Sequence, residues 1–256
     1  MADGEISSAN VVGYTTKAVT AGNYYLVATQ FDKASEGTGS IDMNDLISLS
    51  SDIAPGLYDD DFATAPQILV LKPSGVGYNK YYYISDGTDD KDEELGYNAW
   101  CDVDGYELTS AAKLQIGKGF WFYSPVVSGT ITTAGQVTEE ASKTLSFTTA
   151  TYGIVCNPYP KAVEVNDLFS VTGLTGVDWT FTTEEGDTLA IWDQDAQAYM
   201  VTLYYAGDTA SADMADNGAE PGTWFDMDSY GTATTEIPAG GAFWIQSSGA
   251  GTLTFK

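Results

Sequence analysis

The apolar residues of this chain come in short runs of roughly four to eight residues, the length typical of strands, and Gly, Asp, Asn and Ser separate the runs. The runs are rich in Val, Ile, Thr, Tyr, Phe and Trp, and helical periodicity is scarce. The clearest strands are expected at 68–71, 80–84, 119–123, 189–192, 199–205 and 242–246. Short helices are expected only after Asp42 and after Glu164. The sequence therefore predicts an all-β protein with at most short helices.

The second half of the chain repeats the first at an offset of roughly 122 to 128 residues, a period of domain size. Four blocks carry the match: 24–28 over 152–156, 43–48 over 165–170, 99–106 over 223–230, and 117–122 over 240–245. A period this long indicates a duplicated domain rather than a solenoid of short repeats. We therefore expect two tandem, similar β-sandwich or barrel-like units, residues 1–135 with an extended N-terminal segment and residues 136–256.

Charge and missing residue types exclude several classes of function. The 256 residues include 36 acidic and 10 basic side chains, which gives a net charge of −26, and they include neither His nor Arg. A field of this sign repels phosphate backbones and anionic membrane surfaces, so we expect no nucleic-acid partner. Without His, the Ser-His-Asp, Cys-His and HExxH sites cannot form. We therefore expect a protein that is not an enzyme.

The N-terminus and the cysteines bear on location. No apolar run is long enough for a membrane span, and Met1 precedes Ala2-Asp3-Gly4 like an initiator placed before a mature start. We expect an extracellular or cell-surface protein whose export signal is absent from this sequence. For Cys101 and Cys156, one disulfide and two buried free thiols are both compatible with the sequence.

Paired aspartates are the candidate metal ligands. Asp102 and Asp104 occupy the same repeat positions as Asp226 and Asp228, and Asp193-Gln194-Asp195 is a third pair. Calcium takes about six to eight oxygen ligands, so each pair would supply only part of a calcium site. The alternative is a turn in which the Asp carboxylate accepts hydrogen bonds from nearby backbone N–H groups. We expect no cofactor unless calcium binds at these pairs.

Aromatic side chains are the candidate ligand or partner contacts. In Tyr81-Tyr82-Tyr83, strand alternation sends Tyr81 and Tyr83 to one face. Trp179 and Trp192 have no Trp at the matching position of the first half, so they are candidate sugar platforms. The alternative for the tyrosines is ordinary half-buried strand residues. The Trp residues that do recur in both halves are expected to be core or sheet-facing anchors: Trp100, Trp121, Trp224 and Trp244.

Two segments carry a resemblance to other proteins. Ser8-Ala9-Asn10-Val11-Val12-Gly13-Tyr14 and Gly117-Lys118-Gly119-Phe120-Trp121-Phe122 resemble a group of predicted exported bacterial proteins of unknown function. Their usual pattern is an export signal, an Ala-Asn-Val-Val-Gly-Tyr-like mature start and β-rich repeats. The resemblance implies an envelope or extracellular location and supplies no catalytic residues.

These observations favour a non-enzymatic extracellular structural or interaction protein, such as a self-assembling subunit of a surface layer or filament. Residues 6–19 and 251–256 are extended and would pair either with neighbouring subunits or within one chain. A glycan-binding module is the first alternative. A glycosidase that uses two carboxylates is the second.

Overall fold

The computed structural model describes residues 12–32, 40–57, 63–85, 99–102, 113–137, 144–147, 151–173, 187–206, 220–226 and 231–256. Regular structure in these ranges is almost entirely β-strand, and the helices α1 (Met43–Leu46) and α2 (Val165–Leu168) have four residues each. The all-β prediction is confirmed, as are the short helices expected after Asp42 and Glu164. Over the described ranges, no helix combines the length and apolar character needed to span a membrane.

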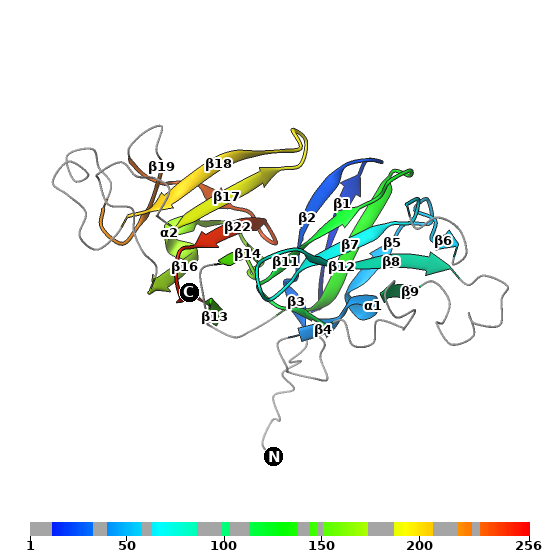
Figure 1. Cartoon of the computed structure of the whole chain (residues 1–256), viewed down its shortest axis with the longest axis horizontal. Coiled ribbons are helices and arrows are strands. Elements are labelled where there is room, and N and C mark those ends of the chain that lie inside the picture. Colours follow the sequence, from blue (N-terminus) through cyan, green and yellow to red (C-terminus); the bar gives the residue numbers. More distant parts are fainter. Residues whose placement is uncertain are drawn as a thin grey trace, which may run out of the picture.

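The first half of the chain forms two layers (Figure 1). The larger sheet has the order β2-β11-β7-β8-β6, and β9 also pairs with β8. Its strands are β2 (Tyr24–Ala28), β6 (Gly56–Leu57), β7 (Gln67–Leu71), β8 (Tyr78–Ser85), β9 (Ala99–Asp102) and β11 (Gly119–Tyr123). The smaller sheet consists of β1 (Val12–Val19), β3 (Phe31–Asp32), β5 (Ile47–Leu49) and β12 (Gly129–Val137). A separate two-stranded ribbon pairs β4 (Ser40–Asp42) with β10 (Lys113–Gln115).

The second half is built in the same way. Its larger sheet has the order β14-β22-β17-β18-β19-β20. These strands are β14 (Thr151–Cys156), β17 (Thr188–Asp193), β18 (Ala198–Tyr205), β19 (Trp224–Asp226), β20 (Gly231–Thr232) and β22 (Ala242–Ser247). The smaller sheet consists of β13 (Thr144–Phe147), β16 (Phe169–Thr172) and β23 (Gly251–Phe255). A separate two-stranded ribbon pairs β15 (Val163–Glu164) with β21 (Glu236–Ile237).

The strand orders of the two larger sheets correspond. The order β2-β11-β7-β8-β9 matches β14-β22-β17-β18-β19 strand for strand along the chain. This agreement is what a duplication requires, and the duplication itself stays a prediction. Strand β12 continues to Val137, past the boundary expected after residue 135.

Each half has its own hydrophobic core between its larger and smaller sheets. In the first core, Phe120 and Phe122 of β11 pack with Ile131 of β12, and all three side chains are at most 2% exposed. In the second core, Phe243 and Ile245 of β22 pack with Leu253 of β23, and all three are fully buried. Only alternate residues of β11 and β22 enter these cores, because successive side chains of a strand point to opposite faces. The other face of each larger sheet is therefore left for a different contact.

An asparagine in each short helix fixes a tryptophan strand. The Oδ1 atom of Asn44 accepts a hydrogen bond from the backbone N–H of Trp100 at 2.9 Å. The Oδ1 atom of Asn166 accepts a hydrogen bond from the backbone N–H of Trp224 at 2.8 Å. The Nδ2 atom of Asn166 donates to the carbonyl of Trp224 at 3.2 Å and to the carbonyl of Ala233 at 2.8 Å. Both Trp side chains are at most 2% exposed. Trp100 and Trp224 are therefore core anchors, as the sequence predicted.

Both ends of the described chain pair in cis. Strand β1 pairs with β12 along its whole length, and β23 lies between β13 and β16. Both edges of β23 are thus occupied within the chain. In contrast, β1 ends its sheet, and Val12 and Tyr14 are 71% and 75% exposed.

The Asn166→Ala variant tests the helix-to-strand link. The change removes one acceptor and two donor contacts and leaves backbone groups of Trp224 and Ala233 without these partners, so the free energy of unfolding should fall by about 1 to 3 kcal/mol. Urea unfolding followed by Trp fluorescence measures this. Asp167→Ala, at the exposed next position, is the control and should change stability by less than about 0.5 kcal/mol. Equal stability of the two variants would contradict the role given to Asn166.

Candidate functional site

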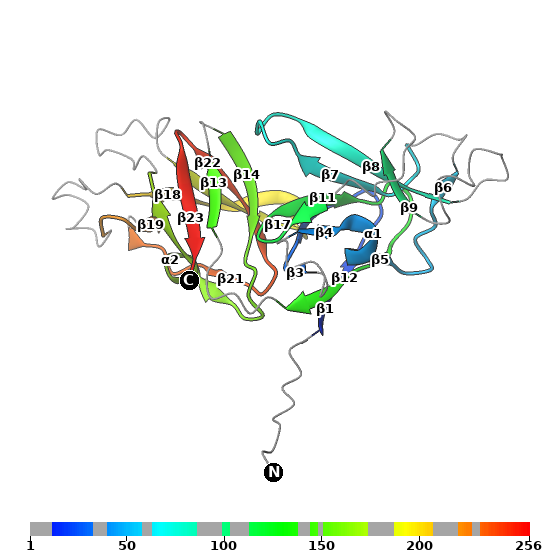
Figure 2. The ribbon, with the colours of Figure 1, turned by 90° about the horizontal axis from the view of Figure 1, so that it is seen from below.

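The two larger sheets pack against each other through the faces that their own cores leave free. Leu26, Leu69, Trp121 and Ile154 are the buried centre of this contact, which we call the interface cluster. The partly buried residues around this centre are Leu71, Tyr78, Tyr123, Trp192, Ala242 and Trp244. Figure 2 shows the two halves side by side, with the β7–β8 hairpin next to β14. The interface cluster therefore joins the two halves of the chain.

Gly119 lets the two sheets approach closely. A Cβ atom at this position would lie 2.6 Å from Cγ2 of Ile154 and 3.0 Å from Cβ of Ala242, distances that require the neighbours to move. Next to it, Lys118 forms a β-bridge with Val155, and the Cys156 N–H donates to the carbonyl of Gly117 at 2.9 Å. Backbone contacts therefore join the two halves of the chain at this end of the interface.

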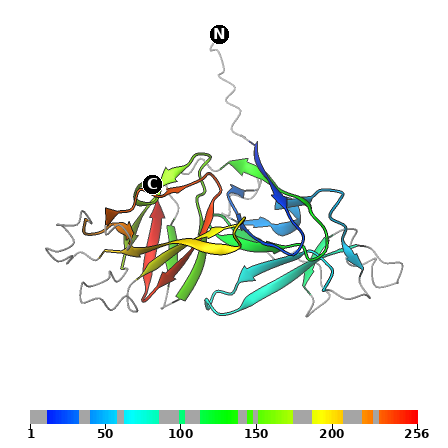
Figure 3. The same ribbon diagram turned by 90° about the horizontal axis from the view of Figure 1, so that it is seen from above.

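The β17–β18 hairpin closes one side of the interface. Its Gln197 side chain accepts a hydrogen bond from the N–H of Tyr24 at 2.7 Å and donates to the carbonyl of Tyr24 at 2.9 Å. Gln194 donates to the carbonyl of Leu26 at 3.4 Å. These two glutamines occupy the outer edge of β2, and Figure 3 shows the hairpin, in yellow, reaching toward the first half. Trp192 of this hairpin packs edge-on against Trp121, with ring centroids 5.0 Å apart.

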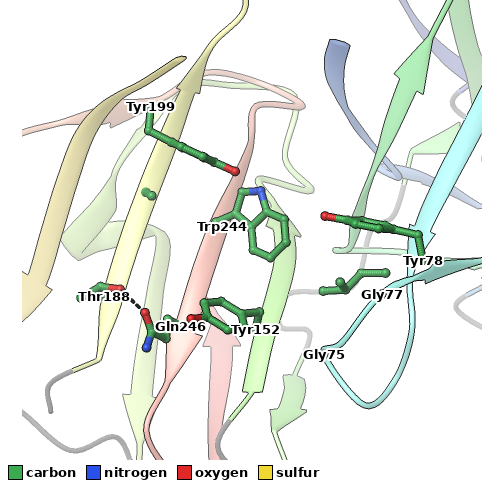
Figure 4. Close-up of a pocket in the computed structure, with 10 residues that line it drawn as sticks. Gly75, Gly77, Tyr78, Tyr152, Thr188, Tyr199, Trp244 and Gln246 are labelled. Carbon is green, nitrogen blue, oxygen red and sulfur yellow. Dashed lines mark hydrogen bonds between the residues drawn. The ribbon is translucent and has the colours of Figure 1, made fainter. Parts of the chain in front are cut away.

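The β7–β8 hairpin leaves the opposite side open. Its turn contains Gly75 and Gly77 with φ of 71° and 78°, and neither carries a side chain that could fill the space in front of the second sheet. A cleft of about 350 Å³ remains between this hairpin and the β14-β22-β17-β18 face, and we call it the aromatic cleft (Figure 4). Its described lining consists of Leu71, Gly75, Gly77, Tyr78, Tyr152, Thr188, Ala190, Tyr199, Trp244 and Gln246.

Four aromatic rings dominate the cleft. Tyr152 and Trp244 meet edge to face with centroids 6.0 Å apart, and Figure 4 shows Tyr78 on the facing hairpin and the Tyr199 hydroxyl pointing toward the Trp244 indole nitrogen. Tyr152 and Tyr199 are 48% and 47% exposed, so they present ring surface to solvent. At one end the Thr188 hydroxyl donates to Oε1 of Gln246 at 3.4 Å. The described lining carries no charged side chain, so the cleft suits a neutral ligand surface with both apolar and hydroxyl groups.

Among the described candidate ligand residues from the sequence, none lines the aromatic cleft. Tyr81 and Tyr83 share one face, as alternation predicted, and both pack against the first core, Tyr83 with its centroid 5.2 Å from that of Trp100. Trp192 is half-buried between Trp121 and Tyr199 in the interface, and it does not line the aromatic cleft. Trp179 lies outside the described residues.

Two of the four candidate metal ligands, Asp102 and Asp226, lie within the described residues. Asp102 ends β9 and Asp226 ends β19, at opposite ends of the molecule, while Asp104 and Asp228 lie outside the described residues (Figure 1). No group of three or more Cys, Asp or Glu side chains in the described part of the chain could hold a metal ion. In the third pair, Asp193 Oδ1 accepts hydrogen bonds from the N–H groups of Asp195 and Ala196, which is the predicted turn.

The cysteines are buried free thiols. Burial, followed by the nearby charge of Asp102, raises the pKa of Cys101 to about 11, so its thiolate is scarce at neutral pH. Cys156 donates weakly to the carbonyls of Lys118 and Thr29 at 3.4 and 3.7 Å. Cys156 therefore belongs to the contact between the halves.

Sequence reasoning missed the tyrosines of the cleft and placed Trp244 only as an anchor. A signal was present in Ala242-Phe243-Trp244-Ile245-Gln246, because a strand that is apolar on both faces must be covered on both faces. The pattern does not say what covers the second face. That information comes from the packing of the other half.

Comparison with known protein families, with curated proteins and with solved structures finds no match to this chain. The resemblance of residues 8–14 and 117–122 to exported bacterial proteins therefore stays a prediction.

Tyr199 provides a pH test of the cleft. Burial, followed by the neighbouring Tyr78, raises the pKa of Tyr199 to about 12. When the pKa of a phenol is higher in the folded than in the unfolded state, the free energy of unfolding falls as pH rises between the two values. Ionisation of Tyr199 should therefore lower the stability of the fold between about pH 10 and 12. The Cζ shift of Tyr199 in ¹³C-tyrosine-labelled protein, assigned with Tyr199→Phe, should still report the neutral phenol at about pH 10.5. A midpoint near the ordinary value would contradict the packing described for this ring.

Proposed function

We propose that the protein is a carbohydrate-binding protein and that the sugar occupies the aromatic cleft. The observation that carries this proposal is the set of four rings around an uncharged hollow, with Thr188 and Gln246 at one end. A sugar ring has apolar C–H faces that pack on aromatic rings and hydroxyl groups that pair with amides and hydroxyls. Binding sites of this kind are mostly apolar with a few placed polar groups.

The charge of the chain also supports a sugar. A net charge of −26 repels polyanions such as nucleic acids, whereas the described lining of the aromatic cleft has no charged side chain and suits the uncharged ring of a sugar. The extracellular location expected from the N-terminal resemblance is part of this proposal, because glycans are common ligands at cell surfaces. The glycosidase alternative is less well supported, since the described lining of the cleft offers no carboxylate pair.

The proposal is tested on a glycan array followed by calorimetry. Tyr152→Ala should weaken binding of the array hits by about tenfold or more, since loss of ring contact worth about 1.4 kcal/mol has that effect. The ring is 48% exposed, so we expect the variant to fold. Trp244→Ala should remove binding altogether. Tyr14→Ala, on a 75% exposed tyrosine of β1, is the matched control and should bind like the parent protein. An array without hits would refute the proposal.

A second candidate function is self-assembly into a layer or filament. It is favoured by β1, which ends its sheet and pairs only with β12 among the described residues. Such an edge can accept a strand from a neighbouring subunit. The C-terminal segment is a weaker candidate, because β13 and β16 already occupy both edges of β23.

Charges on the β1 edge test this candidate. In a Val12→Lys, Tyr14→Lys double variant, charged side chains on the strand edge and the loss of exposed apolar surface should dissolve any assembly. Light scattering after size exclusion and negative-stain images would show the change. Assemblies of unchanged size would exclude strand addition at β1.

A further inference from the structure

A second pocket adjoins the aromatic cleft. It has a volume of about 350 Å³ and lies between the β7–β8 hairpin, β10 and the strands β13 and β14. Leu71 and Tyr152 line both this pocket and the aromatic cleft, so the two hollows meet at these two side chains. A ligand longer than one sugar ring that lies in the cleft can therefore extend into this pocket.

The charge of this pocket is opposite to that of the protein. Lys72, Lys113 and Lys118 line it, although the whole chain has only 10 basic residues against 36 acidic ones. None of its described lining residues is Asp or Glu. We call this hollow the lysine pocket. The other polar side chains of its described lining are neutral: Thr29, Asn79, Tyr81, Gln115, Ser146 and Tyr152.

Two acidic residues lie close to the pocket. Asp42 is opposite Lys113 in the β4–β10 pair, and the charge of Asp102 adds to burial in raising the pKa of Tyr81. Lys113 therefore has an acidic residue as its direct cross-strand neighbour. Within the described ranges, no ion pair involves Lys72 or Lys118, and both residues are exposed.

Lys118 is held in place by its backbone. Its carbonyl accepts a hydrogen bond from Thr29 N–H at 2.9 Å, its N–H donates to Gln115 at 3.1 Å, and its bridge to Val155 ties it to the second half. Lys118 is exposed as a residue, but partial burial of its side chain lowers the pKa of its ammonium group, because desolvation disfavours the charged form. An anion beside it would offset that cost, since charge-assisted hydrogen bonds are among the strongest polar contacts in proteins.

We infer that the protein selects an acidic saccharide, with a sugar ring in the aromatic cleft and a carboxylate or sulfate of the same molecule in the lysine pocket beside Lys72 and Lys118. This inference rests on the proposed carbohydrate-binding function. The rings provide affinity for the sugar, and the lysines discriminate a charged saccharide from a neutral one of the same size. Only a ligand that spans both hollows benefits from both sets of contacts.

The test compares oligogalacturonate with its fully methyl-esterified form, which removes the charge and keeps the sugar. Calorimetry should show at least about tenfold tighter binding of the acid, and an increase in NaCl should reduce that preference. A κ-carrageenan oligosaccharide, which carries sulfate and no carboxylate, distinguishes the two sources of negative charge. Binding of either acidic probe with these properties supports the inference.

Lysine variants assign the preference to the pocket. The Lys72→Gln, Lys118→Gln double variant should lose the preference for the acid and bind the methyl ester within about twofold of the parent protein. Lys161→Gln, at an exposed lysine away from both hollows, is the matched control and should keep the preference. Because Lys72 and Lys118 are surface-accessible, the double variant is expected to fold, and circular dichroism checks this.

The outcomes separate this inference from the proposed function. If acid and ester bind equally well and the lysine variant changes nothing, the acidic selectivity is wrong while carbohydrate binding stands. If the acid is preferred but the double variant keeps that preference, the lysine pocket is not the anion site. If neutral and acidic saccharides all fail to bind, both proposals fall.

Discussion

The contact between the two larger sheets is the interaction on which the rest of the structure depends. Each sheet covers its own core with one face and turns the other toward its counterpart, so Trp121, Leu26 and Ile154 are buried only because both halves are present. Burial of several large apolar side chains contributes about 1.5 to 3 kcal/mol for each one. The absence of a side chain at Gly119 is what permits that close packing.

The aromatic cleft is a consequence of unequal hairpins at this contact. On one side, Gln194 and Gln197 bind the backbone edge of β2 and close the space. On the other, the turn of the β7–β8 hairpin carries Gly75 and Gly77, and the sheets stay apart. The same sheet-on-sheet packing therefore produces a sealed side and an open side. The position of the aromatic cleft therefore follows from the residues of two turns.

Much of the fold follows from local pattern, and much of the site does not. Alternating apolar residues and turn residues predict strands such as β7, β18 and β22. An acidic residue, one apolar residue and then Asn-Asp-Leu mark both short helices. Strand alternation predicts the common face of Tyr81 and Tyr83, but it does not predict that this face packs on the first core or that Tyr81 lines the lysine pocket. The role of Trp244 depends on which distant strand lies opposite. Such long-range packing has no periodic signature in the chain.

The glycine-bearing turn has a consequence for how this protein can diverge. Gly77 has open space around the place where a side chain would begin, and its turn connects strands whose pairing runs from Gln67 with Tyr82 to Leu71 with Tyr78. An Asn there tolerates the left-handed backbone and would add bulk at the mouth of the hollow without altering any strand. A single replacement in this turn can therefore reshape the mouth of the aromatic cleft while the strands around it keep their pairing.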